Sequence, residues 1–384
     1  MPFEFTSAGR IVFGEGAVRE VAPAAAALGR RALVVTGANP ERAASLVKAL
    51  EAAGVSCRPF AVAGEPTVDL VREGAQFARG EQCALVVAMG GGSVIDAGKA
   101  LAALLTNTGD PLDYLEVIGR GQPFEHIPAP MIALPTTAGT GSEVTRNAVL
   151  ASPEHRVKAS LRHASMLPRV AAVDPELTWE LPQAITASTG LDALTQLIEP
   201  YVSPRANAMT DLYCVDGMRR AAAALPKAFD HGRDRAARRE MAWASLLGGL
   251  ALANAGLGAV HGFAAPVGGM FPAPHGAVCA AILPHAIGIN IRALRERAPA
   301  SDALRRYDEV GRLLTGNPHA GAADAIRFVD DLCRRLEIPP LASYGVRRED
   351  FGELASKAAQ ASSMKANPIV LTDGELREIL ERSV

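Results

Sequence analysis

The chain has 384 residues, of which 49% are hydrophobic and 21% charged, and its formal net charge at pH 7 is -2. That length allows two domains with buried cores, and the composition is typical of a globular protein and excludes long disorder. The near balance of 39 basic and 41 acidic residues excludes a bulk attraction to nucleic acid or to an anionic membrane. We therefore expect a small-molecule partner.

The sequence shows no pattern of a targeting signal, and its cysteine spacing is that of an ordinary intracellular protein. No run approaches the ~18 apolar residues of a membrane span, and the N-terminus lacks the basic segment and apolar run of a signal peptide. The five cysteines are scattered and never in CxxC spacing, so we predict reduced core residues rather than a disulfide framework or a zinc knuckle. These features predict a cytoplasmic protein with no membrane partner.

The first half of the chain alternates apolar runs of strand length with amphipathic segments of helix length. Continuous apolar strands separated by helices indicate a parallel sheet covered on both faces. Residues 143–173 mix short β-branched runs with polar turns. The expected strands are Ala32–Thr36, Arg58–Val62, Ala84–Met89 and Met131–Leu134, and the expected helices are Glu41–Ala53, Val68–Arg79 and one from Ser93.

The second half changes character near residues 175–185. From about Pro182 onward, Ala- and Leu-rich segments repeat at helical spacing and no strand-like run remains. These segments are Ala184–Val202, Met209–Ala224 and Arg235–Asn254. We predict a Rossmann-like α/β domain over residues 1–180, followed by an all-helical domain over residues 181–384.

Two glycine- and hydroxyl-rich loops follow apolar strands. The first, GGGSVIDAGK from Gly90 to Lys99, opens a helix. Its glycines let the backbone approach a pyrophosphate, and the free N–H groups and positive end of the helix stabilise that charge. The second loop runs from Pro135 to Glu143. Ligands of open parallel sheets bind at this edge, so a dinucleotide is expected, although a tight turn with nothing bound is the alternative for the first loop.

The residue after the first predicted strand bears on the choice of dinucleotide. An acid there normally holds the ribose 2′-hydroxyl of NAD and repels a 2′-phosphate, but this chain has Gly37. The sequence therefore allows NADP and leaves both cofactors open.

Four residues of the second half suggest a metal site. Asp192 and Gln196 are four apart and share a helix face, while His261 and His275 lie in segments broken by glycine and proline. Two histidines and one carboxylate form the facial set used for Fe(II) with open positions. The alternative is that each histidine is a packed, hydrogen-bonded core residue.

Several long motifs in this order resemble the iron-containing, group III alcohol dehydrogenase family, a relative of the glycerol dehydrogenases. The motifs are GGGSVIDAGK, PTTAGTGSEVT, VDPEL, GLDALTQLIEPYVS, GLGAVHG, PAPHGAVCAAILPH and the late Asn367-Pro368. The resemblance implies a dinucleotide-binding domain, a helical domain and an active site in the cleft between them. It also implies a homodimer formed through an N-terminal hairpin around Gly9–Gly14.

The resemblance further implies roles for individual residues. Asp192, His261 and His275 fall on metal-ligand positions, for Fe(II) first and for Zn(II) or Mn(II) as alternatives. Residues that resemble cofactor-binding positions are Gly91, Gly92, Ser93, Asp96, Thr136, Thr137, Thr140, Thr145 and Lys158.

Two positions depart from the family pattern. Gln196 stands where the family usually has a further histidine ligand, and its neutral amide oxygen is a weaker ligand than imidazole. Ala265 stands where many relatives carry a histidine thought to pass a proton to solvent. We expect water or a ribose hydroxyl of the cofactor to take that role.

The function expected from these features is metal-assisted, reversible hydride transfer between NAD(P) and an alcohol or carbonyl. One alternative is a metal-independent reductase resembling the maleylacetate reductases. Another is a dinucleotide-binding protein that has lost catalysis.

Overall fold

The structure is a computed structural model that describes residues 2–384. The chain divides into two compact units. The α/β unit comprises Ser7–Thr137 and Gly141–Thr178, and the helical unit comprises Trp179–Val384 together with Ala138–Thr140 and the N-terminal residues up to Thr6. A parallel-sheet domain followed by a helical one is the fold class predicted from the sequence, and it is confirmed.

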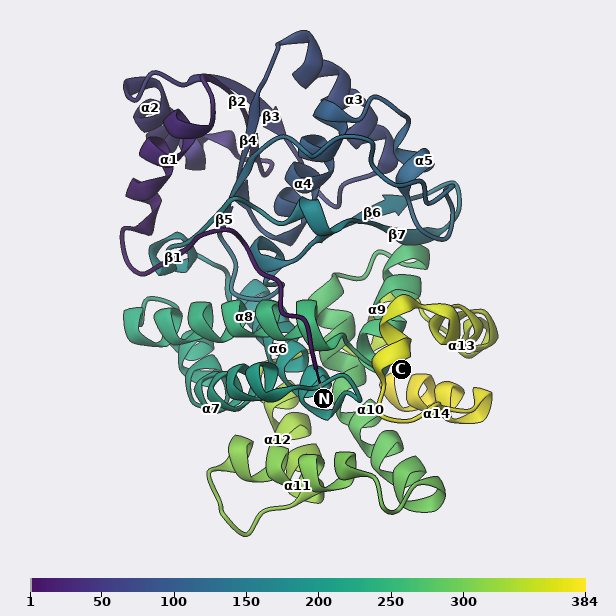
Figure 1. The fold of residues 1–384 in the computed structure, drawn as a ribbon. Helices are drawn as coiled ribbons and strands as arrows, with labels where there is room; N and C mark the ends of the chain where they lie inside the picture. The colour runs from purple at the N-terminus through teal and green to yellow at the C-terminus, as the bar shows by residue number, and fades with distance from the viewer. Residues whose placement is uncertain (1) are drawn as a thin grey trace. The chain divides into compact units, whose positions relative to one another are not determined.

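The α/β unit is built on a six-stranded parallel sheet in the order β1-β8-β5-β4-β2-β3, beside an antiparallel pair, β6 and β7 (Figure 1). The strands are β1 (Ile11–Phe13), β2 (Arg31–Thr36), β3 (Ser56–Ala61), β4 (Leu85–Gly90), β5 (Met131–Pro135), β6 (Asn147–Ser152), β7 (Val157–Arg162) and β8 (Val170–Val173). The helices are α1 (Val21–Leu28), α2 (Ala44–Ala52), α3 (Val68–Gly80), α4 (Gly92–Thr106) and α5 (Pro111–Tyr114).

Both faces of the sheet are covered, which explains why its central strands read as continuous apolar runs. Leu33 and Val35 of β2 pack into a core with α3, α4 and the β6–β7 pair, while Ala32 and Val34 pack into a core with α1 and α2. Successive side chains of a strand point to opposite faces, so a strand buried on both sides needs apolar residues throughout.

The N-terminal hairpin expected around Gly9–Gly14 is wrong, because Ile11–Phe13 is a single edge strand paired in parallel with β8. Gly14 and Gly16 have φ values of 135° and 81°, a backbone region open mainly to glycine. These glycines turn the chain into the 3-10 helix η1 (Ala17–Glu20) and then α1, instead of back along β1.

The helical unit packs nine helices of residues 2–384 around one large apolar core. They are α6 (Gln183–Val202), α7 (Ala208–Asp230), α8 (Arg235–Ala255), α9 (Ala259–Met270), α10 (His275–Arg297), α11 (Asp302–Thr315), α12 (Ala322–Arg335), α13 (Phe351–Gln360) and α14 (Asp373–Ser383). Side-chain caps begin several of them: Asn207 accepts from the N–H groups of Met209 and Thr210 at the start of α7, and Asp234 accepts from Ala237 at the start of α8.

Helix α10 is long and apolar enough to cross a membrane by length and composition, with a mean hydropathy of 1.6 over its most apolar window. However, 78% of that window is buried within the protein. The bent pair α8 and α9, which turn by 100° at their junction, passes the same test only if it counts as one span. Burial of this kind is typical of a core helix.

Candidate cofactor loops and metal centre

The two loops predicted to bind a dinucleotide lie side by side at the carboxyl edge of the sheet. Gly90, the last residue of β4, pairs with Pro135, the last residue of β5, and the Thr136 N–H donates to the Gly90 carbonyl over 2.9 Å. Helix α4 starts at Gly92 with Gly91 as its N-cap, and no side chain caps it. The first-turn N–H groups of α4 are therefore left for a ligand or for water.

Glycine is required in the first loop by close packing. A Cβ on Gly90 would lie 2.5 Å from the Val94 side chain, so any larger residue would displace the start of α4. At Gly91 a Cβ would lie 3.4 Å from the Thr137 methyl group, which places the two loops in contact range. The backbone of α4 is thus held close to the second loop.

Asp96 of α4 holds the second loop in place through both carboxylate oxygens. Oδ1 accepts a short hydrogen bond from the Ser142 hydroxyl and lies 3.1 Å from the Lys99 ammonium, while Oδ2 accepts from the Val149 N–H over 2.9 Å. Lys99 is 1% exposed and also donates to the Thr145 hydroxyl over 2.9 Å. This arrangement gives Asp96 and Thr145 protein partners, and it makes the network a support for the loop.

The other predicted cofactor residues occupy different settings in the structure. Lys158 of β7 is buried and forms an ion pair with Glu65, with Nζ to Oε1 at 2.5 Å. Thr136 is buried, Thr137, Ser93 and Gly92 are half-buried, and Thr140 belongs to the helical unit. Gly37 follows β2 with no atom within 4 Å of the position that a Cβ would take.

Glu143 is the last residue of the second loop. It lies in the 3-10 helix η3 (Ser142–Val144), is 2% exposed, and has no hydrogen-bond partner at Oε2 among residues 2–384. Burial raises the pKa of Glu143 from 4.5 to about 7, although its own backbone N–H and the Lys99 ammonium act in the opposite direction. The folded protein therefore binds a proton that the unfolded chain releases above about pH 4.5. The contribution of this group to stability is lost as the pH rises from there to about 7.

Glu143→Gln is accordingly expected to stabilise the protein more at pH 8 than at pH 5, by about 2 kcal/mol of unfolding free energy. Urea denaturation of both proteins at the two pH values measures this difference. Glu154→Gln, at an exposed position, is the control and should change little at either pH. An effect of Glu143→Gln that is equal at pH 5 and pH 8 would contradict the buried, proton-binding carboxyl group.

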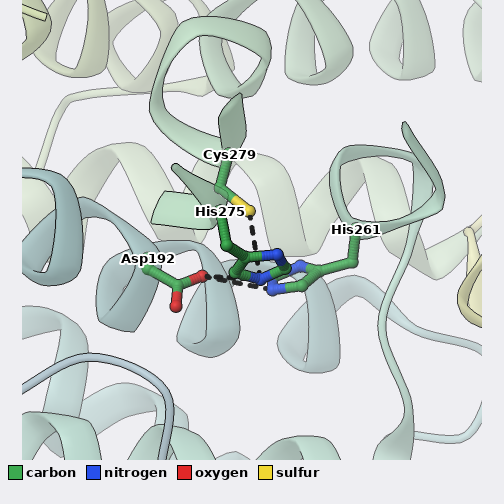
Figure 2. A group of neighbouring side chains, drawn as sticks. All are labelled: Asp192, His261, His275 and Cys279. Carbon is green, nitrogen blue, oxygen red and sulfur yellow. Dashed lines mark hydrogen bonds and ion pairs between the residues drawn. The ribbon is translucent and has the colours of Figure 1, made fainter. Parts of the chain in front are cut away.

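The helical unit brings together the metal-ligand candidates from three helices. Asp192 of α6, His261 of α9 and His275 of α10 turn toward one another, and Cys279 of α10 completes the group (Figure 2). One ligand atom from each of the four residues lies within 4.8 Å of all the others. The Asp192 Oδ1 is 3.3 Å from the His261 Nε2 and 3.7 Å from the His275 Nε2.

Glycine allows the helices that carry these side chains to approach closely. A Cβ on Gly276 would lie 2.4 Å from the Ser188 carbonyl oxygen of α6, so α10 can start beside α6 only with glycine next to His275. A Cβ on Gly258 would lie 2.9 Å from both the Asn367 and the Glu199 side chains.

Those two side chains fix the start of α9. The Glu199 Oε1 accepts from the Val260 N–H over 2.7 Å, and the Asn367 Oδ1 accepts from the Ala259 N–H over 3.1 Å. The other Glu199 oxygen, Oε2, lies 2.6 Å from the His261 Nδ1. A carboxylate only accepts, so Nδ1 carries the proton and the lone pair of Nε2 faces the cluster. A carboxylate behind a histidine is the usual support of a metal ligand.

The electrostatics of the cluster favour a cation. Burial disfavours the charged form of Asp192, but the His275 and His261 imidazoles outweigh it and hold the pKa of this carboxyl below its usual range. Burial likewise lowers the pKa of His261, but the Cys279 sulfur and the Asp192 and Glu199 carboxylates raise it well above its ordinary value. A proton and a metal ion therefore compete for the facing atoms of Asp192 and His261.

The buried polar atoms of the cluster fit a metal ion. Among residues 2–384, Asp192 Oδ1 and His261 Nε2 are buried without a hydrogen-bond partner, because their 3.3 Å approach to each other lacks hydrogen-bond geometry. Buried polar atoms without partners are costly in a native protein, and a bound ion would satisfy both. Gln196 Oε1 is a third such atom, one helical turn beyond Asp192.

Two residues of the site escaped the sequence reasoning. The sequence predicts that all five cysteines are reduced core residues; all five are free, but only Cys279 and Cys214 are fully buried, so the core placement is wrong for the other three. The signal for Cys279 was its position four residues after His275 on one helix, which puts both on one face. Glu199 had no local signal, because its partner His261 lies on another helix.

Residues 8–175 match the family profile of iron-containing alcohol dehydrogenases, and residues 186–384 match the profile of the C-terminal part of that family. The chain is 34% identical over 380 residues to the NAD-dependent methanol dehydrogenase of Bacillus methanolicus, with 97% of each chain covered. It is 35% identical over 380 residues to the 1,3-propanediol dehydrogenase of Klebsiella pneumoniae, covering 97% of this chain and 96% of that one. A solved structure of 1,3-propanediol oxidoreductase superposes with a TM-score of 0.92 and 33% identity over the whole of both chains.

Proposed function

This chain belongs to the iron-containing alcohol dehydrogenase family and is an oxidoreductase of alcohols, and we propose that it transfers hydride reversibly between a nicotinamide dinucleotide and an alcohol or carbonyl substrate at a metal centre built on Asp192, His261 and His275. The observation that carries this proposal is the convergence of these three side chains from three helices, with Asp192 Oδ1 and His261 Nε2 buried and unpartnered.

The dinucleotide would lie against the two loops of the α/β unit. Gly91, Gly92 and Ser93 offer backbone N–H groups at the start of α4 to the pyrophosphate, and the hydroxyls of Thr136 and Thr137 are further donors. Asp96 and Thr145 bond to Lys99 or to the second loop and its flank, so we assign them to positioning that loop. Lys158 pairs with Glu65, outside both loops, and we keep it as a residue of the cofactor surface.

Gly37 supports the use of either NAD or NADP. Gly37 carries no negative charge, and no atom lies within 4 Å of the position that a Cβ would take there. A 2′-phosphate on the adenosine ribose therefore meets neither a clash nor a repelling carboxylate at this residue.

The metal centre would hold Fe(II), with Zn(II) or Mn(II) as alternatives. When bound, such an ion supplies a Lewis acid that polarises the substrate carbonyl and stabilises the alkoxide. Asp192 provides the negative charge of the site, and Glu199 keeps the proton on the His261 Nδ1 so that Nε2 is free to ligate. Since Ala265 cannot carry the alcohol proton, we assign that transfer to water or to a ribose hydroxyl of the cofactor.

Removing divalent metal with a chelator is expected to abolish turnover, and adding back Fe(II), Zn(II) or Mn(II) is expected to restore it. The measurement couples elemental analysis of the protein to NADH and NADPH oxidation over a panel of aldehydes and keto acids. Turnover that resists chelation would select the metal-independent reductase instead. Binding of NAD(P)H without turnover on any carbonyl would select a protein that has lost catalysis.

We also propose a cytoplasmic homodimer. The five free thiols support a reducing compartment. The edge strand β1, where Ile11 is 36% exposed, supports pairing with a second copy. Light scattering measures the mass in solution, and a monomer at micromolar concentration would exclude the dimer.

A further inference from the structure

We propose that Cys279 supplies a fourth protein donor to this metal centre, so that the ion is bound by one carboxylate, two imidazoles and one thiolate. The inference rests on the proposed function, because it concerns the same centre. It goes beyond the facial set of two histidines and one carboxylate, and it gives a role to a residue that composition placed among ordinary core thiols.

Three of the separations among the four donor atoms are close to those of a tetrahedral site, and all of them are within 4.8 Å. With metal–nitrogen and metal–oxygen bonds of about 2.0–2.1 Å and a metal–sulfur bond of about 2.3 Å, tetrahedral geometry separates the donors by about 3.3–3.6 Å. The separations from Asp192 Oδ1 to the two Nε2 atoms are 3.3 and 3.7 Å, and the Cys279 Sγ lies 3.7 Å from the His275 Nε2. These three distances are close to the tetrahedral values, so the fold itself holds these donors near the spacing that a tetrahedral ion needs.

The position of Cys279 on α10 is fixed by the helix itself. His275 and Cys279 are four residues apart, so their side chains lie one above the other on one face. That face meets Asp192, and in Figure 2 the thiol points into the same space as the two imidazoles. Cys279 is 0% exposed, and its Sγ lies 3.7 Å from the His275 Nε2.

Gln196 is the competing donor, and its surroundings favour Cys279 instead. The amide oxygen of Gln196 lies 3.5 Å from the position that a Cβ on Gly248 would take, which places it against helix α8. An amide is neutral, whereas a thiolate adds negative charge and a strong bond to a dication. The thiolate is therefore the stronger of the two candidate donors.

A sulfur donor changes which metals the site prefers. Thiolate is a soft ligand that favours Zn(II) and Co(II) over Mn(II), whereas carboxylate and imidazole alone discriminate less. We accordingly expect the preference for Zn(II) over Mn(II) to fall in Cys279→Ser, as measured by competition between the two ions for the protein.

X-ray absorption spectroscopy of the full-length, zinc-loaded protein tests the proposal without any substitution. The expected spectrum contains one sulfur neighbour at about 2.3 Å besides nitrogen and oxygen neighbours at about 2.0–2.1 Å. A first shell made of nitrogen and oxygen alone would overturn the proposal.

Cobalt substitution provides a second, independent readout. The Co(II)-loaded protein is expected to show a thiolate-to-cobalt charge-transfer band in the near ultraviolet, which Cys279→Ser abolishes, while the zinc affinity falls by more than about tenfold. Cys214→Ala, which changes a buried cysteine of α7, and Gln196→Ala should both keep the band. A band that persists in Cys279→Ser, or no band in the unmodified protein, would reject Cys279 as a ligand.

These readouts separate the two proposals. If turnover depends on metal but neither the sulfur shell nor the cobalt band appears, the dehydrogenase function stands and the role of Cys279 is wrong. If no divalent metal binds to the intact protein at all, the proposed metal centre fails and the role of Cys279 fails with it.

Discussion

Asp192→Asn is expected to lower kcat/KM by roughly 10³-fold or more and to leave the purified protein with little bound metal. Asparagine keeps the shape of the side chain but removes the negative charge from Oδ1, which is buried at the centre of the cluster. A buried dication held by two neutral imidazoles and at most one thiolate still needs that charge, because a buried ion whose charge is not balanced is strongly unfavourable. Metal content per chain and steady-state kinetics measure the two effects.

The matched control is Asp331→Asn, which makes the same chemical change at an exposed residue of α12. Metal content and kcat/KM should both stay near those of the unmodified protein. Asp192→Asn protein that keeps its metal and its rate would show that this cluster is a buried polar network without a catalytic role, and the metal-independent reductase would then be favoured.

Glu199→Gln is expected to weaken metal binding by about 10–100-fold, although Glu199 does not face the ion. The amide oxygen can still accept from the Val260 N–H, but an NH₂ group would then face the His261 Nδ1. Because an amide NH₂ donates, Nδ1 would have to accept, and the imidazole proton would move to Nε2, where it blocks ligation. The substitution thus acts through the tautomer of His261.

Zinc titration of the apo-protein measures the affinity, and the thermal midpoint of the apo-protein shows whether the fold is intact. Glu180→Gln, at an exposed position before α6, is the control. A structural role alone would lower the midpoint without changing the affinity of the protein that remains folded. An unchanged zinc affinity in a well-folded Glu199→Gln protein would remove Glu199 from the metal centre.

Much of the α/β unit could be predicted because its signals are local. The central strands are apolar over most of their length, and strand-to-helix alternation permits few arrangements other than a parallel sheet. The expected strand Met131–Leu134 differs from β5 by one residue. Strands β1 and β8 are harder to predict, because they have only three and four residues and their identity as strands depends on pairing with each other. A strand that short has too few side chains for a periodic pattern.

The sequence alone determined which chemical groups this protein offers: glycine-rich turns at strand ends, and an aspartate and two histidines on helical segments. Backbone conformation and helical spacing follow from neighbours in the chain, so they leave a readable pattern. Only the tertiary structure decided which groups meet. The close approaches at Gly258 and Gly276 set α9 and α10 against α6, and that packing places a thiol in the cluster and a carboxylate behind one imidazole. Contacts between helices far apart in sequence depend on how their surfaces fit, and no local pattern records that fit.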